Sequence, residues 1–254
     1  MKRRKAGIGI FVIVLIITAV RVKSMDSHRI SGRILAENIA GPGMLRLVEQ
    51  SMQARARKTS VTEIAVKERK HPQAALTFDD GPDIRYTPLL LDGLKERNVR
   101  VSFFLLGEKV EQYPELVERM QKEGHLVGNH TYHHVQLNKL NETKAREEIL
   151  KTNNLIYETT GVYPLYLRPP FGAWKKNLEL CVEMLPVFWT IDTLDWKVQN
   201  TEKIVRTVQE KIEDGAIILM HDEYDTSVEA ALQVVDELKN QGYELVTVDQ
   251  LILP

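Results

Sequence analysis

Short apolar runs alternate with helical patterns along most of this chain, and that alternation constrains the fold more than any other feature. Seven runs from residue 74 onward have the length and composition of buried strands: Ala74–Phe78, Val101–Leu106, Leu126–Gly128, Leu165–Leu167, Val187–Thr190, Ala216–Met220 and Glu244–Val248. Four of the segments between them have helical patterns with glycine just past the end, as left-handed C-caps require: Pro114–Lys122, Asn141–Thr160, Thr201–Ile212 and Ser227–Asn240. Together they predict an α/β fold with a parallel sheet covered by helices, either closed into a barrel or open.

The length and composition of the chain fit an ordinary globular core. Its 254 residues are enough for one large α/β domain or two small ones, and hydrophobic residues make up 43%. The single cysteine, Cys181, excludes an internal disulfide and any zinc site built from several cysteines. Its apolar neighbours indicate a small buried hydrophobe rather than a nucleophile.

The amino terminus has the pattern of a membrane-targeting segment. Four basic residues at positions 2–5 precede the uncharged stretch Ala6–Val20. That stretch is shorter than the roughly 20 residues of a full span, but flanking basic side chains can extend it by snorkelling. Because Thr18–Arg21 offers no small-x-small cleavage site, we expect residues 1–23 to be an uncleaved, single-pass anchor with the rest of the chain outside the cytoplasm. A cleaved signal peptide and secretion are the alternative.

Charge divides the chain into a basic tail and an acidic remainder. Residues 1–70 carry 15 basic and 5 acidic side chains, whereas residues 71–254 carry 19 and 30. Since the basic tail begins with a membrane signal, an anionic membrane surface is the expected partner rather than nucleic acid. We interpret residues 24–70 as a stalk or linker and residues 71–254 as the functional domain.

Two carboxylates, Asp79 and Asp80, follow the first predicted strand, directly before Gly81 and Pro82. Consecutive residues of a strand point to opposite faces, so one carboxylate can bind a metal while the other acts as a base. The alternative is simple turn chemistry, for which Asp-Gly-Pro is common.

Histidines near the middle of the chain provide further candidate metal ligands. On a helical turn, His130 and His134 would share one face, and with one aspartate they would form a three-ligand site open to water. His133 is an alternative metal ligand, and we interpret His125 as a structural residue. Such histidine pairs also occur by chance on helix surfaces. Asn129 can cap the turn.

Other candidate residues also follow predicted strands. Arg168 can hold a carboxylate in its ionised form, or it is a surface arginine of a rigid proline loop. Trp196 beside Asp195 is either a sugar platform or part of the core. His221 ends an apolar run and becomes an acid if a carboxylate favours its imidazolium form. Loops after parallel strands converge on one edge, so these residues can form one site.

These motifs together resemble those of the polysaccharide deacetylases, the NodB-homology domains of carbohydrate esterase family four. In order, they are Thr-Phe-Asp-Asp-Gly-Pro, His-Thr-x-x-His, Arg-Pro-Pro-Phe-Gly, Asp-x-x-Asp-Trp and Leu-x-His-Asp, and the similarity covers about residues 72–250. The resemblance implies a distorted (β/α) barrel of about seven parallel strands. It also implies a hydrolase that removes acetyl groups from N-acetylglucosamine polymers or acetylated xylan, with a divalent metal that is usually zinc and sometimes cobalt.

The resemblance also implies individual roles. Asp79 is the base, and the metal ligands are Asp80, His130 and His134. Arg168 orients Asp79, and Asp195 tunes His221, the general acid. The backbone N–H of Phe171 helps to form the oxyanion hole, although tyrosine is also common at that position, and Trp196 and Leu219 line the acetyl pocket.

Peptidoglycan is the expected substrate, because the predicted anchor would place the domain outside the cytoplasm. An O-acetyl esterase of xylan type and a non-catalytic wall-binding domain are the alternatives, and the complete set of catalytic positions counts against the second. The sequence leaves open the exact polymer, the chain-length preference, the native metal and the oligomeric state.

Overall fold

The computed structural model describes residues 71–174 and 184–252. The predicted anchor at 1–23, the predicted stalk at 24–70 and Cys181 lie outside these residues and stay predictions. Within the described part of the chain, no helix is both long and apolar enough to cross a membrane.

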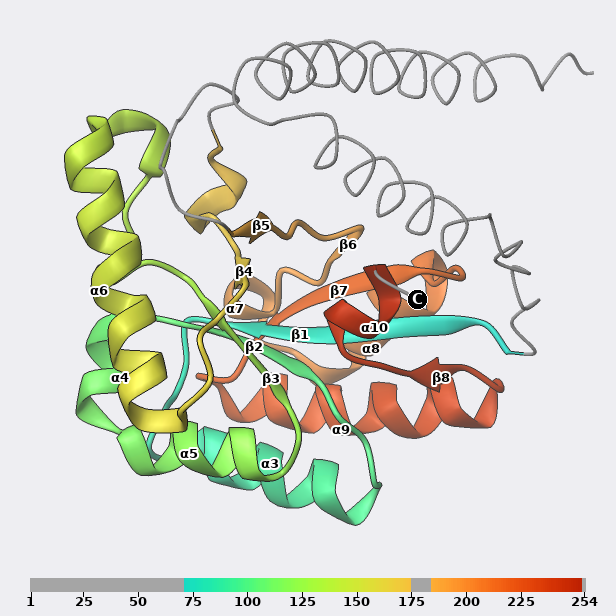
Figure 1. Cartoon of the computed structure of the whole chain (residues 1–254). Coiled ribbons are helices and arrows are strands. Elements are labelled where there is room, and N and C mark those ends of the chain that lie inside the picture. The colour runs from blue at the N-terminus through green and yellow to red at the C-terminus, as the bar shows by residue number, and fades with distance from the viewer. Residues whose placement is uncertain (1–70, 175–183, 253–254) are drawn as a thin grey trace, which may run out of the picture. The chain divides into compact units, whose positions relative to one another are not determined.

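Eight strands form one sheet, and every pairing in it is parallel (Figure 1). The strands are β1 (Gln73–Asp79), β2 (Ser102–Leu105), β3 (Leu126–Asn129), β4 (Tyr166–Leu167), β5 (Leu185–Pro186), β6 (Ile191–Asp192), β7 (Ala216–His221) and β8 (Glu244–Leu245). Seven of them follow the order β5-β4-β3-β2-β1-β7-β6, and β8 pairs with the start of β1. This confirms the predicted α/β sheet of about seven parallel strands.

The sheet is an open, curled half-barrel rather than a closed one. Its two ends are β5 and β6, which are neighbours in sequence but lie at opposite ends of the hydrogen-bonded order. The chain passes from one end to the other between residues 186 and 191. The predicted distorted barrel is therefore only half formed, because the hydrogen-bonded order ends at β5 and β6 without closing.

Helices connect most of the strands. They are α3 (Tyr86–Glu96), α4 (Gly107–Gln112), α5 (Pro114–Lys122), α6 (Glu142–Thr160), α7 (Asp195–Val198), α8 (Thr201–Lys211), α9 (Asp225–Asn240) and α10 (Val248–Ile252), with short 3-10 helices η1 (Leu137–Lys139) and η2 (Pro170–Gly172). The four predicted helices are confirmed to within two residues at each end. Asn141 caps α6 by accepting from Lys144 N, and Gly161 ends it with a φ of 72°.

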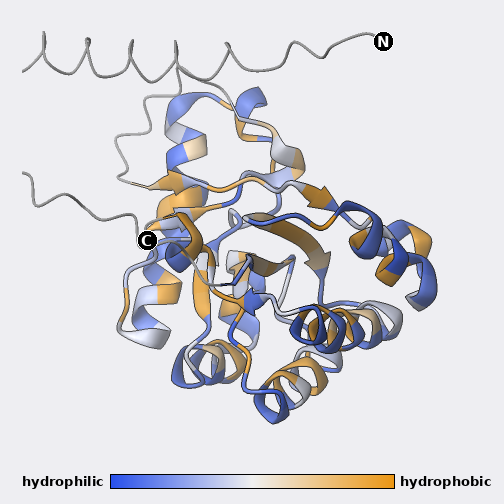
Figure 2. Ribbon diagram, turned by 90° about the vertical axis from the view of Figure 1, so that its right-hand side faces the viewer, coloured by the Kyte–Doolittle hydropathy of each residue, from blue (hydrophilic) through white to orange (hydrophobic). Residues whose placement is uncertain are grey.

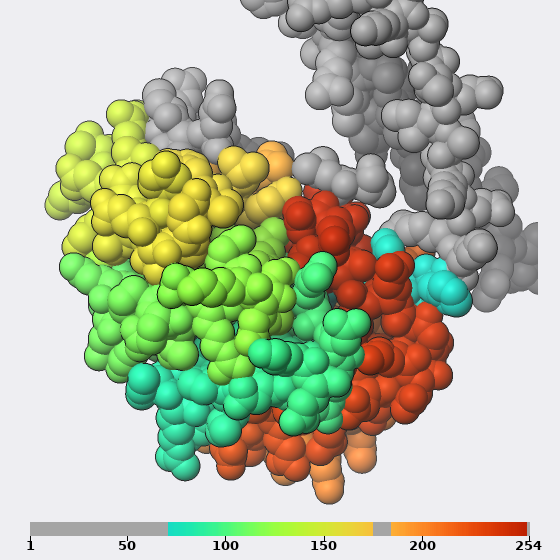
Figure 3. Space-filling model, turned by 60° about the horizontal axis from the view of Figure 1, so that its bottom comes forward, coloured from blue at the N-terminus to red at the C-terminus, as the bar shows by residue number. Residues whose placement is uncertain are grey.

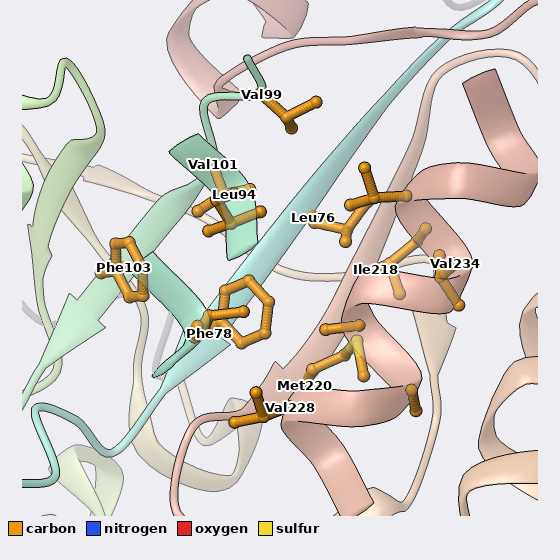
Figure 4. Packing of buried hydrophobic residues seen from close by; sticks show 14 of the residues in the cluster. Leu76, Phe78, Leu94, Val99, Val101, Phe103, Ile218, Met220, Val228 and Val234 are labelled. Carbon is orange, nitrogen blue, oxygen red and sulfur yellow. The ribbon is translucent and has the colours of Figure 1, made fainter. Parts of the chain in front are cut away.

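The main apolar core lies between the sheet and the helices that cover one side of it. Phe78 and Phe103 stack with ring centroids 5.4 Å apart, and Leu76, Ile218 and Met220 extend the same cluster toward α9 (Figure 4). The strands and the inward faces of the helices are hydrophobic, whereas the outward faces of the helices are hydrophilic (Figure 2). Such burial is the main stabilising contribution to the fold.

Helices far apart in the sequence share the outer face of this layer. The segments of α3 and α9 meet on the surface in Figure 3, and the Arg97 guanidinium, just after α3, forms two 2.8 Å hydrogen bonds with the Asp236 carboxylate of α9. The amino-terminal and carboxyl-terminal parts of the domain are thus fixed to one another on the side away from the strand ends that carry the site.

Two of the predicted strands differ from the structure. Val187–Thr190 is not a strand: Val187 N donates to Leu167 O on β4, whereas Thr190 N donates to Ile217 O on β7. This apolar run crosses from one edge of the sheet to the other, which explains its partial burial without strand pairing. Glu244–Val248 pairs only over its first two residues, because Val248 already begins α10.

Candidate metal centre and active site

Polar residues gather where the parallel strands end. In the register of the sheet, Asp79 at the end of β1 lies opposite His221 at the end of β7. The loops after β3 and β4 start with His130 and Arg168. The structure thus brings together the side chains that the sequence placed at separate strand ends.

Asp80, His130 and His134 form a cluster suited to a metal ion. One ligand atom from each lies within 4.8 Å of the others, and Asp80 Oδ1 is 3.4 Å from His130 Nε2 and 3.5 Å from His134 Nε2. Asp80 Oδ1 is buried but has no hydrogen-bond partner. Because an unpartnered buried carboxylate oxygen is costly, a divalent cation at this point fits the residues present.

The two histidines are held by a loop and not by the predicted helical turn. Residues 130–134 have no helical structure, since Thr131 and His134 have φ values of 68° and 54°. The Asn129 carboxamide oxygen accepts from Thr131 N at 2.7 Å, so Asn129 does hold this segment, but as a loop. The structure therefore brings His130 and His134 together, but through the loop rather than through helical i, i+4 spacing.

Hydrogen bonding orients His130 for metal binding. Its Nδ1 lies 2.6 Å from the carbonyl oxygen of Arg168, which can only accept, so Nδ1 carries a proton and Nε2 faces Asp80. Burial lowers the pKa of His130, but the charges of Asp79 and Asp80 outweigh it and raise that pKa. Burial lowers the pKa of His134.

The three histidines around Asp80 keep its carboxyl group ionised. Burial raises its pKa, but the neighbouring His130 and the charges of His134 and His221 outweigh burial and lower the pKa of Asp80 to about 2. An anionic carboxylate at neutral pH is the state that binds a cation.

Asp79 has a different environment from its neighbour. Arg168 Nη1 donates to Asp79 Oδ1 at 2.8 Å and to the Thr77 hydroxyl at 2.6 Å, and that hydroxyl donates to the Ile218 carbonyl oxygen. Arg168 is fully buried, with its guanidinium 4.2 Å above the Phe104 ring, so it is not the surface arginine of the alternative interpretation. Burial lowers the pKa of Arg168, while Asp79 opposes that effect.

His221 and Asp195 form the second buried pair. Asp195 Oδ1 lies 2.8 Å from His221 Nδ1, and its other oxygen accepts from His221 N at 2.8 Å. Burial lowers the pKa of His221, but the hydrogen bond and charge of Asp195 raise it overall to about 9. His221 Nε2 faces the cluster, 3.9 Å from Asp80 Oδ2.

Of the remaining predicted residues, Phe171 contacts this centre, while Trp196 and Leu219 lie close in sequence to Asp195 and His221. Phe171 has a φ of 59°. Its exposed ring packs against the His134 ring, with ring centroids 4.5 Å apart. Trp196, beside Asp195, is half exposed and therefore not a core residue. Leu219 is buried on β7, where its carbonyl oxygen accepts from the Thr193 hydroxyl.

Two other histidines separate clearly from the cluster. His133, the competing candidate, turns away to Glu148, whose Oε1 lies 2.8 Å from its Nδ1. His125 is buried and accepts from Val101 N, in keeping with a structural role, and burial lowers its pKa to about 4.

Three supporting residues were not found from the sequence as parts of this site. Thr77 shares a strand face with Asp79, because it lies two residues earlier, and that spacing was an available signal. Phe104, on β2, lies under the Arg168 guanidinium. Glu148 contacts the histidine loop from α6, and no sequence pattern indicates that contact.

Comparison with known proteins gives a consistent match. Residues 66–187 match the family model described as polysaccharide deacetylase. The chain is 42% identical over 185 residues to a peptidoglycan-N-acetylglucosamine deacetylase, PgdA, of Listeria monocytogenes, covering 73% of this chain and 40% of that protein. It is 40% identical over 186 residues to a peptidoglycan-N-acetylglucosamine deacetylase of Bacillus cereus, covering 70% and 68%.

A solved structure agrees with the sequence relationships. The structure of the peptidoglycan deacetylase PdaC from Bacillus subtilis aligns with a TM-score of 0.70 and 41% identity, over 72% of this chain and 91% of that one. The chain spans about two fifths of the length of the Listeria relative.

Proposed function

The chain belongs to the polysaccharide deacetylase family, and from this premise we propose that it is a metal-dependent hydrolase of a cell-wall polysaccharide. The reaction is removal of N-acetyl groups from N-acetylglucosamine units, with peptidoglycan as the substrate. The names of the relatives from Listeria and Bacillus support this substrate class.

One observation carries the proposal: two oriented ionisable side chains flank a metal-ligand cluster. Asp79 with its Arg168 partner and His221 with its Asp195 partner both lie beside Asp80. A base and an acid on either side of one electrophilic centre is the arrangement that amide hydrolysis needs.

Asp80, His130 and His134 would hold the cation, and one carboxylate with two imidazoles is a donor set that zinc accepts in catalytic sites. Zinc is the metal we propose, with cobalt as a substitute. When bound, the cation supplies Lewis-acid polarisation of the acetyl carbonyl and acidifies a water molecule.

The protein side chains would then move the protons. Asp79 accepts a proton from the water that attacks the acetyl carbon. The Phe171 N–H donates to the oxygen that gains negative charge. His221 Nε2 donates a proton to the leaving amine as the C–N bond breaks, so the products are acetate and a glucosamine unit. Trp196 and Leu219 would line the acetyl pocket.

The location of the enzyme is part of the same proposal. The basic cluster and apolar run at residues 1–23 support a single-pass anchor in the cell membrane, followed by a stalk at 24–70 and an extracytoplasmic catalytic domain at 71–254. Protein recovered from its host should then fractionate with membranes. A soluble mature chain that begins near Lys23 would support secretion instead.

Acetate release tests the reaction. We expect the zinc-loaded protein to release acetate from peptidoglycan and from chitooligosaccharides, and much less from acetylxylan. Preference for acetylxylan would indicate the O-acetyl esterase, and no release from any of the three would indicate a non-catalytic wall-binding domain. His221→Ala should slow amide substrates more than activated esters, whose leaving groups need little protonation.

A further inference from the structure

The loop that carries the two candidate histidine ligands needs external support. Two of its five residues, Thr131 and His134, have left-handed backbone conformations that side chains disfavour. Such conformations persist only where surrounding contacts hold them. The contacts that hold the middle of the loop, between the two ligands, therefore influence where both imidazoles point.

Glu148 supplies three of these contacts from the neighbouring helix α6. Its Oε2 accepts from the backbone N–H of Tyr132 at 3.0 Å and from that of His133 at 2.9 Å. Its Oε1 lies 2.8 Å from His133 Nδ1. Tyr132 and His133 are residues between the ligands, and the Glu148 side chain is only 16% exposed.

The helix that carries Glu148 is itself fixed to the strand from which the loop leaves. The buried Asn129 side chain donates to the Ile149 carbonyl oxygen at 2.9 Å and to Asn153 Oδ1 at 2.7 Å, both on α6. Its own oxygen accepts from Thr131 N at 2.7 Å. Asn129 at the start of the loop and Glu148 at its middle thus tie one loop to one helix.

We propose that Glu148 is a positioning residue for the metal centre. It holds His130 and His134 in the arrangement that binds the cation. This inference rests on the proposed metal site. A simple surface ion pair with His133 would involve Oε1 alone. The two backbone hydrogen bonds of Oε2 do not depend on the His133 ring, and they act on the loop itself.

Zinc affinity of the metal-free protein, measured by competition with a chromogenic chelator, tests the proposal. We expect Glu148→Ala to weaken zinc binding by about 10- to 100-fold, the usual effect of removing a residue that orients metal ligands. Glu148→Gln should recover part of the affinity, because its amide oxygen can still accept from the two N–H groups. His134→Ala should abolish binding.

Two matched variants serve as controls. His133→Ala removes the ring contact but leaves the backbone contacts of Glu148, so zinc affinity should change by less than about threefold. Glu147→Ala removes the exposed carboxylate next along the helix and should change nothing. Equal zinc affinity in Glu148→Ala and wild type would overturn the proposal, as would equal losses in His133→Ala and Glu148→Ala.

The visible spectrum of the cobalt-loaded protein gives a readout that reports ligand geometry. Glu148→Asp keeps the charge but shortens the side chain, so its cobalt spectrum should differ from that of wild type even where the protein is fully folded. An unchanged spectrum and affinity would refute the role. Tight zinc binding without acetate release would instead refute the proposed hydrolysis and leave the role of Glu148 standing. Failure of the wild type to bind zinc would overturn both.

Discussion

The apolar cluster under the sheet and the polar loops at the strand ends are built in opposite ways. The cluster consists of side chains on regular strands and helices, such as Phe78 and Phe103, which pack against many neighbours. The loops depend on a few hydrogen bonds between specific partners, such as Arg168 with Asp79. The effect of losing one core contact is therefore spread over many neighbouring side chains. Loss of one site contact instead leaves a buried polar group without a partner.

Backbone conformation shows the same contrast. Among the described residues, seven other than glycine have positive φ, and five of them belong to segments that carry site residues: Asp80, Thr131, His134, Phe171 and Leu194. Each such residue costs on the order of 1–3 kcal/mol. The core therefore stabilises the fold, and part of that stability is used to hold an unfavourable backbone geometry at the site.

Asp79→Asn should show the largest difference between an effect on the site and an effect on the core. Loss of the base should lower kcat by about 10²- to 10⁴-fold. Zinc binding should persist, because Asp80 supplies the carboxylate ligand. Steady-state kinetics, zinc titration and thermal unfolding of the same preparation would measure all three. Loss of zinc in this variant would contradict the division of labour between the two aspartates.

The core counterpart is Phe78→Ala. Phe78 is fully buried at the centre of the cluster, so its truncation should lower the free energy of unfolding by about 3–5 kcal/mol. The zinc affinity of the fraction that remains folded should be nearly unchanged, as measured by denaturant titration with and without metal. A proportional loss of zinc affinity would show that the two regions are not separable.

His125 provides a test of the core side through pH. Its pKa is about 4 in the folded protein because of burial, against 6.5 in the unfolded chain. The unfolded state therefore binds the proton first, and stability should be lost as the pH falls from 6.5 to 4, by about 3 kcal/mol. His125→Asn keeps an acceptor for Val101 N and should flatten this dependence in urea titrations. An unchanged slope would contradict the assignment.

The smallest expected effect is a shift in the pH profile of the site. Asp195 raises the pKa of His221, so Asp195→Asn should lower that pKa by about 1–3 units. Activity requires the protonated acid, and the alkaline limb of kcat should therefore move to lower pH. An alkaline limb that stays in place would remove Asp195 from its tuning role.

The same contrast explains what the sequence could predict. Apolar runs of strand length identified most strands, and helical patterns followed by glycine identified four helices. Strands buried on both faces are apolar along their length, whereas helices bury one side with a period of 3.6 residues. The ends of the apolar runs also placed Asp79, His130, Arg168 and His221 at strand ends. Parallel strands bring these ends to one edge of the sheet, so the four side chains were expected to meet. These are the parts of the molecule in which local pattern and tertiary structure agree.

Contacts between distant segments were beyond such reasoning. The apolar run at Val187–Thr190 looks like a strand locally, and only the open seam of the sheet makes it a crossing. The loop at 130–134 has helical spacing but adopts left-handed conformations that depend on Asn129 and Glu148. The position of Glu148 relative to Tyr132 and His133 is set by the docking of α6, which no pattern within the helix records.

Arg168 touches the site through two chemically different groups. Its guanidinium holds Asp79, and its carbonyl oxygen holds His130. An alanine scan removes only the first group, because every residue type retains the carbonyl. Such a scan would therefore record Arg168 as a partner of the base alone, and its hold on the metal ligand would go unseen. An ester in place of the amide between Arg168 and Pro169 weakens that carbonyl as an acceptor. It would therefore test the contact between the Arg168 carbonyl oxygen and His130, which side-chain substitution leaves in place.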